Sequence, residues 1–144
     1  MAQAQKQVRI IEPLERFVNR INLVGCYARV SSDSEDQLNS YNNQVDFYES
    51  YVNSLENSKL VKIYTDEGIT GTRMDKRDGF LQMIEDCRKG LINTIITKSI
   101  SRFARNITET LSVVRELKSI GVSVYFMTEK IDTAKMGSEM MLAV

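Results

Sequence analysis

The sequence predicts an α/β domain built as three layers, with a largely parallel sheet of about four or more strands and helices on both faces. Short apolar runs alternate with segments in which apolar residues recur every three or four positions, as strands alternating with helices do. This alternation favours right-handed crossovers and parallel strands. The length of 144 residues and the hydrophobic fraction of 42% fit one domain with a core of ordinary size.

The first strand is predicted over Leu23–Val30, where the run "LVGCYARV" is almost wholly apolar. A helix follows it, because Ser34 and Gln37 have the spacing of a capping box. The apolar face of this helix is expected at helical spacing over Leu38, Tyr41, Val45, Tyr48 and Val52.

The strand and helix pattern then repeats twice. A strand over 59–65 leads into a glycine-containing loop over 66–79 and a helix that Gly90 ends, with a face of Phe80, Met83, Ile84 and Cys87. A strand over 93–99 precedes a helix that Gly121 closes, with a stripe of Ile107, Leu111, Val114 and Leu117. The run over 122–127 predicts the fourth strand. Residues 1–21 are expected to form a polar arm, which contains the only proline, Pro13.

The composition excludes several classes of site. The chain has no histidine, so a Ser-His-Asp triad, a Cys-His pair and histidine zinc sites are excluded within it. Lys+Arg and Asp+Glu are both 19, so any nucleic-acid interface has to come from local clustering. Cys26 and Cys87 have apolar neighbours, which predicts two reduced, buried thiols in a cytoplasmic protein. No apolar run approaches the roughly 20 residues that span a bilayer, so no membrane partner is expected.

Polar side chains gather where the predicted strands end. In an open α/β sheet the ligand crevice lies at the carboxyl ends of the strands. The residues there are Arg29, Ser31 and Ser32 after the first strand, Asp66, Thr70, Arg73 and Arg77 after the second, and Lys98, Ser99, Ser101, Arg102 and Arg105 after the third. Guanidinium groups bind phosphate oxygens at two points and stabilise the charge of phosphoryl transfer. A hydroxyl among them suggests attack on phosphorus with no metal or other cofactor.

Each of these residues also has a simpler interpretation. Serines that precede a helix cap it more often than they attack a substrate. Arg102 and Arg105 are compatible with a solvated helix face, and Asp66 before a glycine with a turn. The loop lacks the pattern of a nucleotide-binding P-loop. No single signal defines the function.

Four segments in order resemble the catalytic domain of the serine recombinases, the family of resolvases, invertases and large serine integrases. They are "YARVSS" (27–32), "YTDEGITGT" (64–72), "KRDGFLQMIED" (76–86) and "TKSISRFARN" (97–106). The last segment and the "QLNSYNNQ" helix are most similar to the large integrase and transposase branch. The resemblance implies the resolvase-like catalytic fold over residues 22–134.

The resemblance also implies residue roles. Ser31 is expected to be the nucleophile, with Ser32 at the neighbouring position; the other catalytic residues are expected to be Arg29, Asp66, Arg77, Arg102 and Arg105. Gln44 matches the family's glutamine better than Gln37 does, and Lys98 is a further supporting residue. Ser101 stands where small resolvases carry an aspartate, which leaves the arrangement of proton transfer open.

The family mechanism implies that Ser31 attacks a DNA phosphodiester, forms a 5′-phosphoserine link and releases a 3′-hydroxyl before strand exchange and religation. The base that deprotonates Ser31 is left open between Asp66 and the leaving phosphate, with Arg29 lowering the pKa of the serine. The expected partners are DNA and a homodimer that assembles to a tetramer. Residues 135–144 are expected to start a truncated dimerisation helix, and the fragment alone to recombine poorly.

Two other functions are compatible with a sequence of this kind. One is a flavodoxin-like or receiver-like module that binds a ligand or a signal without catalysis, although neither signature follows the first strand. The other is a metal-dependent nuclease or phosphatase that uses Asp66, Glu67, Asp75 and Asp78 around a hard cation.

Overall fold

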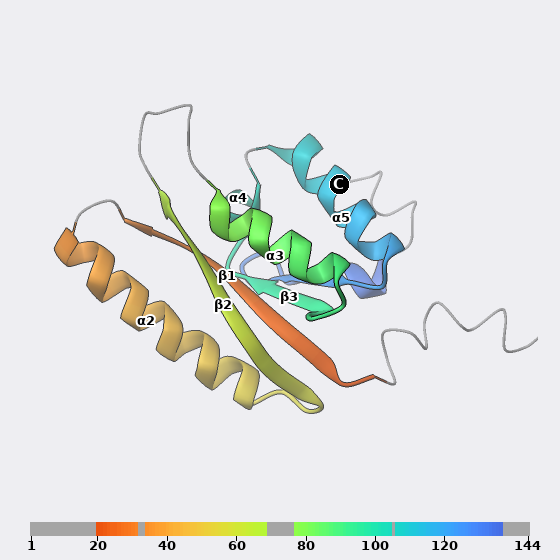
Figure 1. The fold of residues 1–144 in the computed structure, drawn as a ribbon, viewed down its shortest axis with the longest axis horizontal. Coiled ribbons are helices and arrows are strands. Elements are labelled where there is room, and N and C mark those ends of the chain that lie inside the picture. Colours follow the sequence, from red (N-terminus) through yellow and green to blue (C-terminus); the bar gives the residue numbers. More distant parts are fainter. Residues whose placement is uncertain (1–19, 32–33, 69–76, 105, 137–144) are drawn as a thin grey trace, which may run out of the picture.

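The computed structural model describes residues 20–31, 34–68, 77–104 and 106–136; for residue 31 and residues 34–40 it describes the backbone alone. In this part of the chain five strands form one sheet in the order β2-β1-β3-β4-β5 (Figure 1). The strands are β1 Asn22–Ser31, β2 Ser58–Gly68, β3 Thr94–Thr97, β4 Ser123–Phe126 and β5 Ile131–Asp132. The first four run parallel and β5 runs antiparallel to β4. The predicted parallel sheet is therefore confirmed.

Helices cover both faces of the sheet. The helices are α2 Ser34–Asn53, α3 Asp78–Arg88, α4 Ile100–Phe103 and α5 Ile107–Ser119, and η1 Thr133–Lys135 is a 3₁₀ turn. Figure 1 shows α2 on one side of the strands and α3, α4 and α5 on the other. Each face has its own apolar cluster, with Tyr48 of α2 in one and Phe80 of α3 in the other. The three-layer prediction is confirmed.

Aromatic rings join the layers on the α3 face. Edge-to-face pairs run from Tyr27 to Phe80 at 5.3 Å between ring centroids, from Phe80 to Phe103 at 5.1 Å, and from Phe103 to Phe126 at 5.4 Å. Such contacts contribute beyond the area that they bury. They hold the short helix α4 against β1, α3 and β4.

The predicted helix ends agree with the structure. Gly90 follows α3 with φ of +79° and Gly121 follows α5 with φ of +84°, in the left-handed region where glycine ends helices without strain. All four residues of the expected face of α3 are buried.

Two predicted core positions are wrong. Ile107 is 44% exposed, because α5 turns a face of Thr110, Val114 and Leu117 inward instead. The buried hydroxyl of Thr110 donates to the carbonyl of Asn106 at 3.0 Å, so a polar residue is tolerated in the core.

Tyr41 of α2 is exposed for a different reason. The side chain of Gln44 contacts the backbone of Arg29, and this part of β1 extends beyond the end of β3. Tyr41 lies almost one helical turn before Gln44, still further from β3. The first half of α2 therefore has less of the sheet beneath it.

The N-terminal ends of β3 and β4 are joined by Arg20. Its Nη2 donates to the carbonyl of Asn93 at 2.7 Å and its Nη1 to the carbonyl of Gly121. The predicted arm over 1–21 otherwise lies outside the described residues, as does most of the expected C-terminal helix. Within the described ranges no helix is both long and apolar enough to cross a membrane.

Candidate active site

The carboxyl ends of the parallel strands bring three of the expected segments together. Arg29 pairs with Asp66, Ser31 with Gly68, and Tyr27 with Thr97, the last residue of β3. Strand β1 therefore continues past the end of β3 and finishes at Ser31 beside β2. Ser31 is described by its backbone, whereas Ser32 and Arg105 lie outside the described residues.

Asp66 is buried and accepts three hydrogen bonds. Its Oδ2 accepts from the hydroxyl of Tyr27 at 2.6 Å and from the backbone N–H of Phe80 at 2.9 Å, and its Oδ1 accepts from the N–H of Gly79 at 2.7 Å. The carboxylate thus satisfies two N–H groups in the first turn of α3, where Arg77 makes no side-chain cap. Asp66 fixes the start of α3, and its expected part in proton transfer stays a prediction.

The hydroxyl of Tyr27 acts as a donor to this carboxylate. Burial, followed by the hydrogen bond to Asp66, raises the pKa of Tyr27 above its ordinary value. The phenol is therefore protonated at neutral pH. The sequence motifs did not single out Tyr27 as a site residue. The signal that could have indicated it is the two-residue spacing of Tyr64 and Asp66, which puts both on one face of β2, beside Tyr27.

Arg77 directly precedes α3, and its side chain contacts α4 and α5. Its Nη1 donates to Glu109 Oε1 at 3.0 Å, and its Nη2 donates to the backbone carbonyl of Phe103. The guanidinium carbon lies 3.9 Å from the ring centroid of Phe80 and 5.6 Å from that of Tyr27. These contacts leave the side chain of Arg77 only 10% exposed.

Helix α2 holds the backbone of β1 from the opposite face. Gln44 Nε2 donates to the carbonyl of Arg29 at 3.3 Å, and the hydroxyl of Tyr48 donates to the carbonyl of Tyr27 at 3.2 Å. Burial raises the pKa of Tyr48 to about 12, so this donor also keeps its proton. Gln44 thus contacts the strand two residues before Ser31, while the side chain of its alternative, Gln37, lies outside the described part.

The remaining expected residues lie near the end of β3. Lys98, Ser101 and Arg102 are exposed, and the hydroxyl of Ser101 lies 3.1 Å from that of Ser99. Lys98 and Gln44 also border a cavity of about 360 Å³ between α2 and the ends of β3 and β4, which Phe47 and Met127 help to line.

Glu109 is a site residue that the sequence did not indicate. It occupies the third position of α5, and its N–H donates to the side chain of the N-cap residue Asn106 at 2.8 Å. In a capping box the carboxylate would return to the N-cap, whereas here it reaches Arg77, 32 positions earlier in the chain. No local pattern carries that information.

The metal-dependent alternative gains no support from the geometry. Across the described ranges, no three or more Asp, Glu or Cys residues gather as a metal ion would need. The oxygens of Asp66 accept hydrogen bonds from protein donors, and Asp75 lies outside the described residues.

A parallel α/β sheet whose carboxyl edge carries a serine, arginines and no histidine belongs to the class of domains suited to phosphate chemistry. The chain belongs to the resolvase family of serine recombinases: the model of the resolvase N-terminal domain matches residues 24–144. A search of proteins with curated functions found no match.

Solved structures are similar over most of the chain. A resolvase family site-specific recombinase from Streptococcus pneumoniae is 26% identical, with a TM-score of 0.69 over 85% of this chain and 82% of that one. A serine recombinase from Sulfolobus solfataricus is also 26% identical, with a TM-score of 0.56 over 84% of this chain and 74% of that one. The N-terminal catalytic domain of TP901-1 integrase shares the fold at 22% identity and a TM-score of 0.57, over 83% of this chain and 88% of that one.

Proposed function

We propose that Ser31 is the nucleophile of this serine-type site-specific recombinase domain and that its substrate is a DNA phosphodiester. The serine Oγ–phosphorus bond forms as the bond from phosphorus to the 3′ oxygen breaks. The products are a 5′-phosphoserine link and a 3′-hydroxyl, and the 3′ oxygen receives the proton that the serine loses. The reverse attack by an exchanged 3′-hydroxyl rejoins the strands, so ATP and a metal ion are not required.

The position of Ser31 carries this proposal. It is the last residue of β1, at the carboxyl edge of the sheet and two residues after Arg29. Gln44 and Tyr48 anchor the backbone of this strand end, which limits its movement during the reaction. Arg29, Arg77, Arg102 and Arg105 supply the positive charge that binds the phosphate and stabilises its transition state. Ser32, Ser101 and Lys98 support this group.

The family implies a DNA substrate and oligomeric assembly. We infer that the functional unit is a homodimer that pairs into a tetramer in the cytoplasm, because exchange between two DNA sites needs two cleaved duplexes held together. The net charge of zero gives the domain little affinity for DNA by itself, so we expect this chain alone to recombine poorly and its cleavage to be measured at high protein and DNA concentrations. Integration and transposition are the expected biological settings.

Trapping the covalent intermediate tests the nucleophile. The protein is incubated with a duplex that carries its recombination site and a nick beside the scissile phosphate, so that the cleaved strand diffuses away. We expect a protein–DNA adduct that mass spectrometry maps to Ser31. Ser31→Ala should abolish the adduct, whereas Ser32→Ala should slow its formation without abolishing it. An adduct that persists in Ser31→Ala would assign the nucleophile elsewhere.

A further inference from the structure

Arg77 is buried in a way that conflicts with binding an external phosphate. Its side chain is 10% exposed, and both terminal nitrogens donate to protein acceptors, Glu109 and the carbonyl of Phe103. The third nitrogen, Nε, is buried and finds no hydrogen-bond partner within the described part of the chain. Each terminal nitrogen carries a second N–H group, but the side chain is so little exposed that an external phosphate reaches this guanidinium only where one of its protein acceptors moves aside.

The two contacts differ in how easily they are displaced. The carbonyl of Phe103 belongs to the backbone of α4, and the ring of Phe103 is fully buried. The carboxylate of Glu109 ends a flexible side chain that is 33% exposed. The Arg77–Glu109 pair is thus open to solvent on the Glu109 side, and an anion reaches Arg77 by replacing that carboxylate.

A counterion is needed while no DNA is bound. Burying a guanidinium without an anion is unfavourable, because the charge loses its hydration. A carboxylate oxygen and a phosphate oxygen are similar acceptors for a guanidinium, and Glu109 already satisfies Nη1 at 3.0 Å. Glu109 therefore occupies the place of an anionic substrate oxygen.

We propose that Glu109 is a positioning residue that holds Arg77 retracted in the DNA-free enzyme and is displaced from it by the phosphate of the substrate. This proposal rests on the proposed function, in which Arg77 binds a DNA phosphate. Opening the ion pair also frees Arg77 from the first turn of α5. In the sequence, this helix directly follows the segment that carries Arg102 and Arg105.

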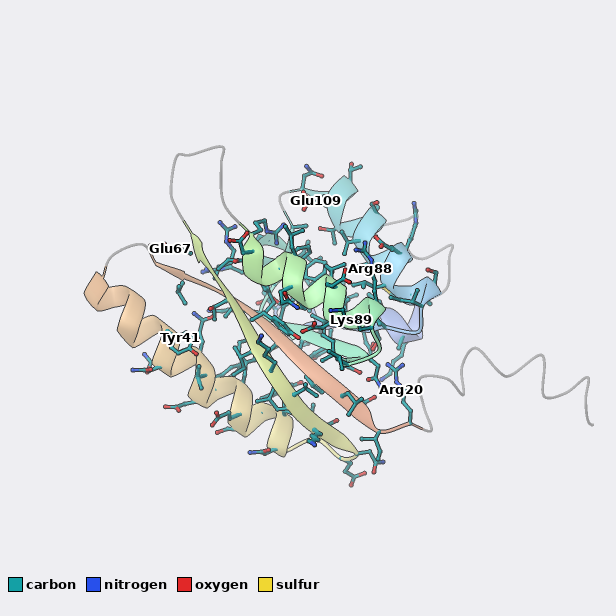
Figure 2. The ribbon with its side chains drawn as sticks, viewed as in Figure 1. Arg20, Tyr41, Glu67, Arg88, Lys89 and Glu109 are labelled. Carbon is teal, nitrogen blue, oxygen red and sulfur yellow. The ribbon has the colours of Figure 1, made fainter. Side chains whose placement is uncertain are left out.

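An ion pair between α3 and α5 provides a matched control. Arg88 Nη2 lies 2.6 Å from Glu116 Oε1, linking the last turn of α3 to α5, and both side chains are about half exposed. Figure 2 labels Arg88, which lies in the last turn of α3, and Glu109, which lies in the first turn of α5. Glu116→Gln removes the same charge from the same helix without contact with Arg77.

The test uses two probes on this chain. Phenylglyoxal modifies accessible arginines, and mass spectrometry of peptides gives the rate at Arg77 and at Arg88. Inorganic phosphate is titrated while NMR follows the Nε–Hε signal of Arg77. In Glu109→Gln we expect roughly three- to tenfold faster modification of Arg77 and phosphate binding tighter by a similar factor, as loss of a part-buried ion pair implies. Glu116→Gln should change only Arg88.

Unchanged rates, or weaker phosphate binding in Glu109→Gln, would overturn the proposal, since either result means that Glu109 does not compete with phosphate. Glu109→Ala also removes the hydrogen bond and should act in the same direction; thermal unfolding establishes that each variant is folded. If Ala unfolds the chain, the isosteric Gln variant decides alone. Both readouts are independent of Ser31, so failure of the trapping experiment leaves this test intact.

In strand cleavage, Glu109→Gln should lower the DNA concentration at half-maximal rate without lowering the maximal rate. A structural role alone would reduce both the rate and the stability. A lower maximal rate at unchanged half-saturation would also contradict the proposal.

Discussion

At the scale of single residues, Asp66 shows how one buried carboxylate organises this site. It joins β1, through Tyr27, to the first turn of α3, through Gly79 and Phe80. Arg77 directly precedes α3, so the carboxylate that fixes the start of this helix also fixes the backbone position of Arg77. Removal of Asp66 is therefore expected to affect both stability and phosphate binding.

Replacing Asp66 by Asn should destabilise the domain by about 1–3 kcal/mol. The NH₂ group of the amide replaces one accepting oxygen, which leaves a buried N–H group or the Tyr27 hydroxyl without its acceptor. Urea unfolding followed by circular dichroism measures the change. Glu67→Gln is the control, since Glu67 is the adjacent residue and is exposed (Figure 2). Equal stability of the Asp66 variant and this control would show that the three hydrogen bonds contribute little.

At the scale of elements, the close approach of α3 to β2 depends on a glycine. A Cβ on Gly79 would lie 2.4 Å from the backbone carbonyl oxygen of Thr65 and 3.0 Å from Asp66 Oδ1. The carbonyl cannot rotate away as a side chain can. Helix α3 can therefore start at this position only if its second residue has no side chain.

Gly79→Ala should destabilise the domain by about 1–3 kcal/mol through overpacking and should shift the start of α3, moving Arg77. Chemical denaturation gives the energy, and the amide chemical shifts of Phe80 and Leu81 report the displacement. Gly90→Ala provides the comparison: its added Cβ meets nothing within 4 Å, and its cost of about 1 kcal/mol arises only from the positive φ. Undisturbed shifts in Gly79→Ala would mean that β2 moves rather than α3.

At the scale of the whole molecule, the two apolar clusters each contain a free, buried cysteine, Cys26 on the α2 face and Cys87 on the α3 face. Burial raises the pKa of each thiol to about 12. The thiolate, which is the reactive form, is therefore scarce in the folded domain at neutral pH. The prediction of two reduced, buried thiols is confirmed in structure.

Alkylation should consequently report unfolding of each face. At pH 8 we expect iodoacetamide to modify neither thiol on the time scale of minutes in buffer and both in urea, as peptide mass spectrometry would measure. Each cysteine serves as the control for the other: if the two layers unfold together, the thiols become reactive at the same urea concentration. Rapid labelling of Cys26 alone in buffer would show that α2 detaches while the rest of the domain is folded.

The sequence predicted the elements well where periodicity and glycine signals were strong. The face of α3 and the helix ends at Gly90 and Gly121 follow from local patterns. Strand β5 and helix α4 are too short to produce such patterns, having 2 and 4 residues. The exposure of Ile107 depends on how α5 is rotated against the sheet, which its neighbours decide.

For the site, the residue types alone specify the chemistry: serine and arginine side chains follow parallel strands, and histidine is absent from the chain. These features are local or follow from topology. The contacts of Tyr27 with Asp66, of Gln44 with Arg29 and of Glu109 with Arg77 become visible only in the folded domain. Those contacts join residues 15 to 39 positions apart, and their geometry depends on how the layers pack, which periodicity along one element does not encode.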